Sequence, residues 1–288
     1  MSKDNEQGML YLCATPIGNL SDITERVIET LKCADLIAAE DTRNTIKLLN
    51  HFDIKTQLVS YHEHNKYDRA KELIAKMKEG KTVALVSDAG TPAISDPGEV
   101  ITAMCHEEGI KVTSLPGPCA LITALTLSGL PARRFVFEGF LPSDKKERKQ
   151  VLSKLKDETR TIIIYESPHH LRDTLCEISD TLGNRRIAIC RELTKKFEEV
   201  KHMSLVKAKE YYGINEPKGE FVLVIEGRSE DEINLEKADA FRKMDINEHM
   251  EMYEAQGMDR REAMKKVAAD RGVSKREIYD MLLNNKEQ

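Results

Sequence analysis

The first 115 residues alternate short apolar runs with longer amphipathic ones, and this alternation constrains the fold more than any other feature. The apolar runs have the length of buried strands, and the stretches between them have helical spacing. The predicted strands are residues 9–15, 35–39, 57–60, 82–87 and 111–115. The predicted helices include 42–50, 66–79 and 99–108. Strands that alternate with helices form a mostly parallel sheet with both faces covered, so this part is predicted to be an α/β domain.

A second series of strands is predicted after a small-residue helix at 120–128 and a break at Ser128–Pro131. Its apolar runs are residues 135–141, 161–168, 186–193, 198–203 and 220–227. From about residue 229, Gly and Pro thin out and the pattern becomes helical, and Ala268–Tyr279 has the spacing of a helix-turn-helix. The predicted fold is two α/β/α domains with a small helical, helix-turn-helix-like C-terminal domain. The predicted boundaries are a polar tail 1–8, α/β domains 9–124 and 125–228, and a helical domain 229–288.

Composition places the chain among globular proteins of the cytoplasm. A length of 288 residues with 32% charged residues and 5% aromatic ones allows a sizeable core. The most apolar stretches, such as Thr161–Tyr165, are too short to cross a bilayer, and the start MSKDNEQG lacks the features of a signal peptide. The six cysteines form no CxxC pair and are expected to be small buried thiols. His62-Glu63-His64 has no further ligands at useful spacing, so no metal site is expected.

Positive charge is concentrated locally, because the whole chain has a net charge of −5. One basic run is Lys145–Lys149. The other is Met258–Arg276, in which seven Lys/Arg and three Asp/Glu give a balance of +4. Either run alone is as well explained by a solvated helix face as by contact with nucleic acid.

Four turns rich in Gly and Pro follow predicted strands, at the end of the sheet where open α/β folds bind ligands. They are residues 15–19, 87–98, 115–120 and 166–169. Gly and Pro fix unusual backbone angles and let a ligand approach main-chain groups closely. Any one of these turns could simply reverse the chain, but four of them together favour a ligand cleft between the two α/β domains.

The turn at 86–98 indicates what kind of ligand this is. The chain has neither GxGxxG after the first strand nor GxxxxGK[ST], so common dinucleotide and triphosphate sites are unlikely on motif grounds. The turn carries no Lys or Arg to meet phosphates, but it carries Asp88 and Asp96. Carboxylates suit a ligand with hydroxyls, amino groups or positive charge. S-adenosylmethionine, with its ammonium, sulfonium and ribose hydroxyl groups, fits that description.

A set of longer motifs resembles a known family. LYLCATPIGNLSDIT, AEDTR, VALVSDAGTPAISDPG, SLPGPCA, IIIYESPHH and KGEFVLVIEG occur in this order over residues 9–227. Together they resemble the bacterial 16S ribosomal RNA cytidine 2′-O-methyltransferases of the tetrapyrrole-methylase-like (class III) S-adenosylmethionine-dependent group. The helical tail is similar to the extra C-terminal domain of that subfamily. The resemblance implies S-adenosylmethionine in the cleft, a homodimer, and 16S rRNA within the small ribosomal subunit, in its decoding region, as the substrate.

The resemblance also implies which residues bind the cofactor. They are Pro16, Gly18, Asp88, Ala89, Gly90, Thr91, Ile94, Pro116, Gly117, Cys119, Ala120, Glu166, Leu193, Gly219 and Glu220. Thr91 stands where many relatives carry Asp, and Asp88, three residues earlier, can supply a carboxylate in its place.

Transfer from a sulfonium needs an in-line acceptor hydroxyl and a proton acceptor, but neither a covalent nucleophile nor a metal. In relatives, substrate-facing residues end the second strand, which implies Glu40 or Asp41 as proton acceptor and Arg43 as a phosphate contact. An internal salt bridge at this strand end explains the same residues equally well. The predicted RNA-binding residues are Arg43, Arg191, Lys195, Arg260, Arg261, Lys265, Lys275 and Arg276.

Two alternative functions remain open. One is a methylase of the same fold acting on a tetrapyrrole of the precorrin or sirohaem type. The EDTR strand end, Thr91 and the helical tail argue against it, because a small-molecule enzyme has no evident use for such a tail. The other is a non-catalytic RNA- or ribosome-binding protein, against which the full set of cofactor turns argues.

Overall fold

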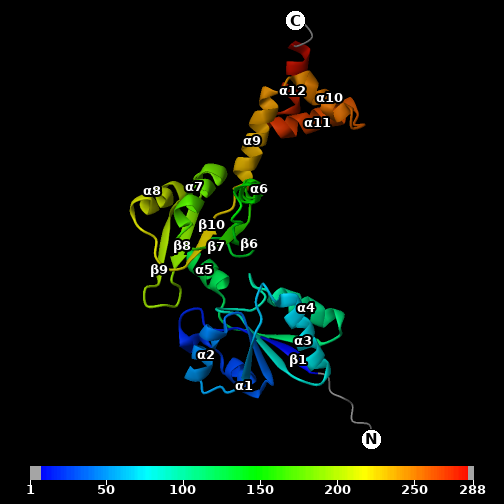
Figure 1. Cartoon of the computed structure of the whole chain (residues 1–288). Helices are drawn as coiled ribbons and strands as arrows, with labels where there is room; N and C mark the ends of the chain where they lie inside the picture. The colour runs from blue at the N-terminus through cyan, green and yellow to red at the C-terminus, as the bar shows by residue number, and fades with distance from the viewer. Residues whose placement is uncertain (1–7, 285–288) are drawn as a thin grey trace. The chain divides into compact units, whose positions relative to one another are not determined.

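The structure is a computed structural model that describes residues 8–284, so most of the predicted polar tail 1–8 lies outside the described residues. The chain divides into two compact units, Met1–Ser153 with Arg160–Glu226, and Lys154–Thr159 with Gly227–Gln288. The first unit contains two five-stranded sheets and the second is helical, which confirms the predicted α/β fold class with C-terminal helices (Figure 1). Within 8–284, no helix is both long and apolar enough to span a membrane.

The first sheet is entirely parallel, as predicted. Its strands are β1 (Met9–Cys13), β2 (Leu36–Ala39), β3 (Gln57–Ser60), β4 (Val83–Val86) and β5 (Lys111–Leu115). They are ordered β3-β2-β4-β1-β5. The central strands β2 and β4 are buried along their whole length, which is why their sequences, LIAA and VALV, are apolar without alternation.

Four helices cover the two faces of this sheet. They are α1 (Glu25–Cys33), α2 (Thr42–His51), α3 (Lys66–Lys78) and α4 (Gly98–Glu107). Leu31 of α1 and Leu49 of α2 are buried on one face, whereas Leu73 of α3 and Ile101 of α4 are buried on the other (Figure 1). The chain therefore leaves the adjacent strands β1 and β4 toward opposite faces. Such a switch point is where open α/β sheets form a ligand crevice.

The second sheet is mixed. Its strands are β6 (Phe135–Phe140), β7 (Thr161–Glu166), β8 (Arg186–Arg191), β9 (Glu199–Ser204) and β10 (Phe221–Ile225). In the order β6-β7-β10-β8-β9, β6 and β7 are parallel and the other pairs are antiparallel. Helix α5 (Ala120–Ser128) packs on one face, and its core cluster includes Ile17 from the turn after β1. The remaining helices of this half are α6 (Lys145–Leu155), α7 (Leu171–Leu182) and α8 (Leu205–Ile214).

The predicted boundary between the α/β domains, at residues 124 and 125, falls inside α5 and stays a prediction. The predicted basic run Lys145–Lys149 lies at the start of α6. Its Arg148 is only 9% exposed and donates from Nε to the Pro142 carbonyl, so this arginine is a packing residue and not part of a charged surface. The expectation of buried cysteines is wrong for Cys33, which is exposed on α1, while Cys119 and Cys176 are half-buried.

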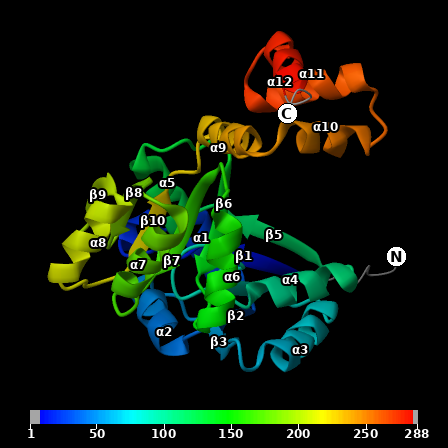
Figure 2. The same cartoon turned by 90° about the horizontal axis from the view of Figure 1, so that it is seen from above.

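The second unit is built from α9 (Glu230–Lys243), α10 (Ile246–Glu254), α11 (Arg260–Arg271) and α12 (Lys275–Asn284). Its core contains Met250, Val267 and Ile278. The hairpin expected near 268–279 is present (Figure 2): α11 ends at Gly272, and Ser274 and Glu277 then cap α12 reciprocally.

Candidate active site

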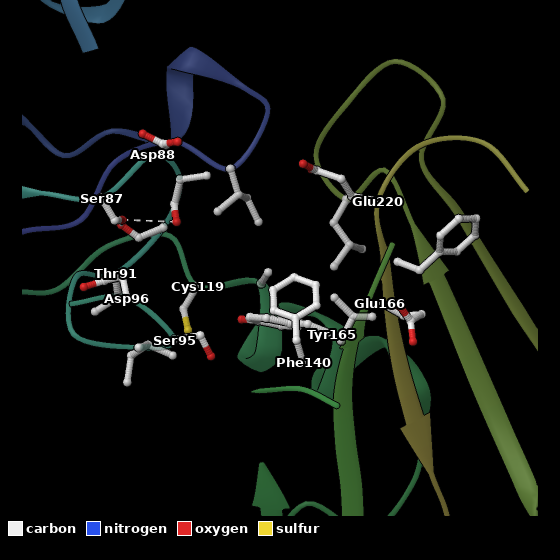
Figure 3. Close-up of a pocket in the computed structure, with 18 of the residues that line it drawn as sticks. Ser87, Asp88, Thr91, Ser95, Asp96, Cys119, Phe140, Tyr165, Glu166 and Glu220 are labelled. Carbon is white, nitrogen blue, oxygen red and sulfur yellow. Dashed lines mark hydrogen bonds between the residues drawn. The ribbon is translucent and has the colours of Figure 1, made fainter. Parts of the chain in front are cut away.

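All four predicted turns contribute to one pocket of about 440 Å³ in the first unit (Figure 3). Ile17 comes from the first turn and the segment 87–96 from the second. Cys119 and Ala120 come from the third turn, and residues 166–168 from the fourth. The ends of β8 and β10 complete the lining with Leu193, Glu220, Phe221 and neighbouring residues. The strand ends of both sheets therefore converge on one cavity of a size typical for a bound cofactor.

The turn after β4 is fixed by bonds to two other turns. Thr15 and Gly90 exchange backbone hydrogen bonds of 2.9 and 3.0 Å. The hydroxyl of Thr91 donates to the Pro118 carbonyl at 3.0 Å, so its polar group is already used within the protein. One oxygen of Asp96 accepts from the backbone N–H groups of Ala93 and Gly98 at 2.9 and 2.7 Å. These bonds hold the floor of the pocket in one shape.

Backbone strain is concentrated around the same pocket. Five non-glycine residues in the described part of the chain have positive φ, and four of them flank it. Ala93 (67°) and Ser95 (60°) lie in the turn after β4, while Glu192 (51°) and Thr194 (65°) flank the pocket residue Leu193. Such conformations persist where the surrounding structure imposes them, and they are common at ligand sites.

The pocket is strongly acidic. Its lining includes the five carboxylates of Glu40, Asp88, Asp96, Glu166 and Glu220. Among the residues that the structure describes, no lysine or arginine lines it. Burial raises the pKa of Asp96 despite its backbone hydrogen bonds. A pocket with this lining favours a cationic or hydroxyl-rich ligand and disfavours a phosphate.

Glu40 and Asp41 are neighbours at the end of β2, but their environments differ. Glu40 is half-buried and lines the pocket, and its pKa is raised first by burial and then by the charges of Asp88 and Asp96. Asp41 caps the N-terminus of α2 by accepting from the Arg43 N–H at 2.8 Å. Hydrogen bonds from Arg43 lower the pKa of Asp41 to about 2. Of the two carboxylates, Glu40 is therefore the better proton acceptor.

The opposite wall contains two further carboxylates that are held differently. Glu166 is 6% exposed, and its oxygens accept from the Ser167 N–H at 2.7 Å and the Thr174 hydroxyl at 2.5 Å. Glu220 is paired with Lys195 at 2.8 Å. The Ser167 hydroxyl oxygen is buried at the pocket and has no hydrogen-bond partner among the described residues. A bound ligand can supply that partner.

Ten of the residues predicted to bind the cofactor line the pocket. They are Asp88, Ala89, Gly90, Thr91, Ile94, Cys119, Ala120, Glu166, Leu193 and Glu220. Pro16, Gly18, Pro116, Gly117 and Gly219 lie in the same turns but outside the lining, and their role stays a prediction. Gly117 has a packing reason, because a Cβ atom there would lie 2.7 Å from the Ala14 Cβ.

Sequence reasoning did not single out several lining residues. They include Ile17, Ser87, Ser95, Phe140, Tyr165, Cys190, Phe221 and Val222. Most of these immediately precede or follow a motif that was identified, so extending each motif by two residues would have included them. Phe140 was not accessible in this way, because its position depends on an irregularity in β6.

The predicted RNA-binding residues lie apart from the pocket lining. Arg43 is exposed and paired with Asp41. Arg191 donates to the Lys218 carbonyl at 2.6 Å and lines a separate hollow of about 280 Å³. Within the second unit, Arg260 and Arg261 line a groove of about 380 Å³ together with Tyr279. Lys265 and Arg276 are exposed on the same helices, and Lys275 is half-exposed.

Metal-binding geometry was searched over residues 8–284. No group of three or more His, Cys, Asp or Glu side chains in this range is arranged to hold a metal ion. His62 and His64 face each other with ring centroids 6.0 Å apart, without a third ligand in such a group.

Comparison with known families gives the same assignment as the geometry of the pocket. The model of the Tetrapyrrole (Corrin/Porphyrin) Methylases matches residues 9–209. The chain belongs to the tetrapyrrole methylase family. Among curated members, it is 52% identical to Ribosomal RNA small subunit methyltransferase I of Halalkalibacterium halodurans, over 96% of this chain and 95% of that one. It is 47% identical to the protein of the same name from Bacillus subtilis, over 96% and 94%.

Solved structures of tetrapyrrole methylase fold agree with this architecture. Uroporphyrin-III-C-methyltransferase from Thermus thermophilus aligns over 76% of this chain and 94% of that one, with a TM-score of 0.55 and 19% identity. Diphthine synthase aligns over 77% and 91%, with a TM-score of 0.59 and 16% identity. One structure of the Thermus enzyme contains S-adenosyl homocysteine. At these identities the likeness extends to the fold, and the acceptor must be inferred from other features.

Proposed function

We propose that this protein is an S-adenosylmethionine-dependent methyltransferase that modifies the ribose 2′-oxygen of a cytidine in 16S rRNA, within the small ribosomal subunit. The observation that carries the proposal is the acidic pocket free of described cations, in a chain about half identical to ribosomal RNA small subunit methyltransferases. The motifs of residues 9–227 support the cytidine ribose as acceptor by resemblance.

The pocket fits S-adenosylmethionine in both charge and shape. Asp88 and Glu220 offer carboxylates to the ammonium, sulfonium and ribose hydroxyl groups, and the unpaired Ser167 hydroxyl offers a further contact. Leu193 and Phe221 provide an apolar surface for the adenine ring. When bound, the cofactor supplies a methyl group that is already activated as part of a sulfonium.

Glu40 is the proposed proton acceptor for the acceptor hydroxyl. It lies in the pocket lining, its pKa is raised by burial and by Asp88, and no other described side chain is recorded as its hydrogen-bond partner. A carboxylate with a raised pKa is a stronger base than an ordinary one and still remains ionised at neutral pH. Asp41 has the helix-capping role instead, and it orients Arg43 through a pair of 2.8 Å.

RNA contacts are proposed for the exposed cations outside the pocket. Arg43 lies two residues beyond the cap of α2, close in sequence to Glu40, where it can contact a phosphate beside the target. Lys195 and Arg191 belong to the strand ends of the other sheet. The groove of Arg260, Arg261 and Tyr279 on the tail combines charge with an aromatic side chain that is 54% exposed. Such a combination suits single-stranded RNA.

The deciding experiment is methyl transfer from labelled S-adenosylmethionine to three acceptors in parallel: unmodified small subunits, free 16S rRNA and a tetrapyrrole precursor. Label on a cytidine ribose 2′-oxygen of the subunit RNA is expected. Label in the tetrapyrrole alone would reassign the substrate, and failure to bind the cofactor would favour a non-catalytic RNA-binding protein. Light scattering of the same sample tests the proposed homodimer.

A further inference from the structure

We propose that Phe140 is the surface on which the base of the acceptor nucleotide stacks, and that the acceptor must therefore be an unstacked, single-stranded nucleotide. This inference rests on the proposed function and specifies how that site takes its substrate. The residue lies at the end of β6 and lines the pocket (Figure 3).

Phe140 differs from the rest of the lining in its exposure. The inner surface is buried, with Cys190 at 1%, Phe221 at 2% and Leu193 at 6% exposure. Phe140 is 60% exposed, and Ile94 on the turn after β4 is 40% exposed. These two side chains form an apolar rim around a buried interior. A ligand that enters after the cofactor meets this rim first.

A bulge in β6 brings Phe140 to the pocket. Phe137 pairs with Ile163 of β7, but Phe140 pairs with Tyr165, so three residues of β6 span two of β7. Without the extra residue, Phe137 and Phe140 would point to opposite faces of the sheet. With it, both rings contact Tyr165, at centroid distances of 4.9 and 5.6 Å.

Gly139 makes the bulge possible. Its φ is 64°, and a Cβ atom at this position would lie 2.9 Å from the Ser95 Oγ in the turn after β4. The bulge therefore also permits close contact between β6 and the pocket turn. Bulges of this kind commonly redirect side chains beside functional sites.

One side of the Phe140 ring is supported and the rest remains open. Tyr165 contacts it at an interplanar angle of 64°, and the Tyr165 hydroxyl accepts from the Leu121 N–H at 3.1 Å, which fixes the supporting ring. Burial raises the pKa of Tyr165 to about 12, so the hydroxyl stays neutral. An aromatic ring held at its edge and 60% exposed leaves a flat apolar surface for a base.

The charge of the pocket determines which part of a nucleotide can enter. Five lining carboxylates and no described lysine or arginine repel a phosphodiester backbone. The phosphates must remain outside, near exposed cations such as Arg43, while the ribose and base enter. A base inside a duplex cannot reach a site in this way without leaving its stack.

A tryptophan at position 140 provides a direct test, because the chain contains no tryptophan. In Phe140→Trp, the single indole reports stacking by loss of its fluorescence. The probe is a single-stranded oligocytidylate added to protein saturated with S-adenosylmethionine, and the control RNA has one abasic ribose. Phe197→Trp is the matched control variant, because Phe197 is 65% exposed and lies outside the pocket lining.

Quenching by oligocytidylate that weakens with the abasic RNA and is absent in Phe197→Trp is the expected result. Quenching by the cofactor alone, with no further change on adding RNA, would overturn the proposal, because the ring would then face the cofactor. An unchanged spectrum while a filter assay shows bound RNA would overturn it as well.

Kinetics with small subunits decide the case in which the short RNA does not bind. Phe140→Leu should lower kcat/KM about 10- to 100-fold, the range for loss of one base–aromatic stack, with cofactor affinity unchanged. Phe140→Tyr should restore it, and Phe197→Leu should match the wild type. Equal rates for wild type and Phe140→Leu would refute the stacking role while leaving the proposed methyl transfer intact. Conversely, base-dependent quenching without any transfer by the wild type would refute only the proposed activity.

Discussion

The pocket of the first unit and the helical tail carry opposite charge. The pocket lining combines five carboxylates with no described lysine or arginine. Helices α11 and α12 of the tail expose Arg260, Arg261, Lys265 and Arg276. A cationic small molecule and a polyanion cannot be bound well by the same surface. The difference therefore indicates that cofactor chemistry and RNA affinity are separated between two parts of the chain.

The largest expected effect comes from the acidic side of this comparison. Glu40→Gln should lower kcat for methyl transfer by about 10²- to 10⁴-fold, the usual range for loss of a general base. Cofactor affinity should change little, because the shape of the pocket is kept. In the wild type, kcat should fall as the pH drops through the raised pKa of Glu40, and this acid limb should disappear in the variant.

Asp41→Asn is the control for that prediction, since asparagine also caps helices. It should retain most of the activity, because Asp41 is bonded to Arg43 and its low pKa makes it a weak base. If Asp41→Asn lost as much activity as Glu40→Gln, the roles of the two carboxylates would have to be exchanged.

The basic side should give a smaller effect with a different signature. Neutralising Arg260, Arg261 and Arg276 to glutamine should weaken RNA binding roughly tenfold near physiological salt and reduce its salt dependence by up to about one unit of slope per contact. Cofactor binding measured by calorimetry should be unchanged. A matched charge removal at the exposed Lys32, Lys71 and Lys76 of the first unit should leave RNA binding as it was. Equal weakening by both sets would mean that the tail has no special role.

Capping of α2 should have a measurable effect on stability. Asp41→Ala removes the side-chain acceptor of the Arg43 N–H and should lower the free energy of unfolding by about 1 kcal/mol. For a domain of this size that is a shift in Tm of about 2–4 °C, measurable by calorimetry of the whole chain. Asp41→Asn should unfold near the wild-type temperature, and a loss as large as that of alanine would contradict the capping role.

The tail should also respond to acid, and this is the smallest effect expected. His249 is fully buried, stacks on Phe241, and accepts from the Arg271 Nε–H at 3.1 Å, while Asp270 and Tyr253 lie on its other side. Burial and Arg271 lower the pKa of His249, and Asp270 opposes this shift. The unfolded chain then binds more protons than the folded one as the pH falls below about 6.5, so the tail loses stability there.

Hydrogen exchange in α10 and α11 between pH 7 and 5 measures this loss. Exchange should accelerate toward pH 5, after correction for its intrinsic pH dependence, while the first sheet remains protected. An unchanged tail would show that the Asp270 contact offsets the burial of His249.

Strand sequences and strand ends were predictable from local pattern. The runs that became β3 and β5 were predicted with their observed bounds, because buried parallel strands are apolar without interruption. The convergence of four turns followed from one rule, that parallel strands end at the same edge of a sheet. Glu40 was found for the same reason, as the residue that follows β2.

Tertiary context decided the features that were not predictable. Arg148 belongs to a run of charged residues, yet the Pro142 carbonyl and the packing of α6 bury it. Asp41 and Glu40 are adjacent carboxylates, and only the start of α2 gives them different roles. Phe140 reaches the pocket through the bulge before it, and a pairing irregularity with β7 leaves no clear mark in the sequence of β6 alone.

The positive φ angles around the pocket have a consequence for protein engineering. Ala93, Ser95, Glu192 and Thr194 each hold a conformation that costs about 1–3 kcal/mol in a non-glycine residue. Together these costs are comparable with much of the net stability of an ordinary domain. A selection for heat resistance that ignored activity would therefore be expected to enrich glycine or asparagine at these four positions. The map of such variants would outline the ligand site of a protein whose substrate had never been tested.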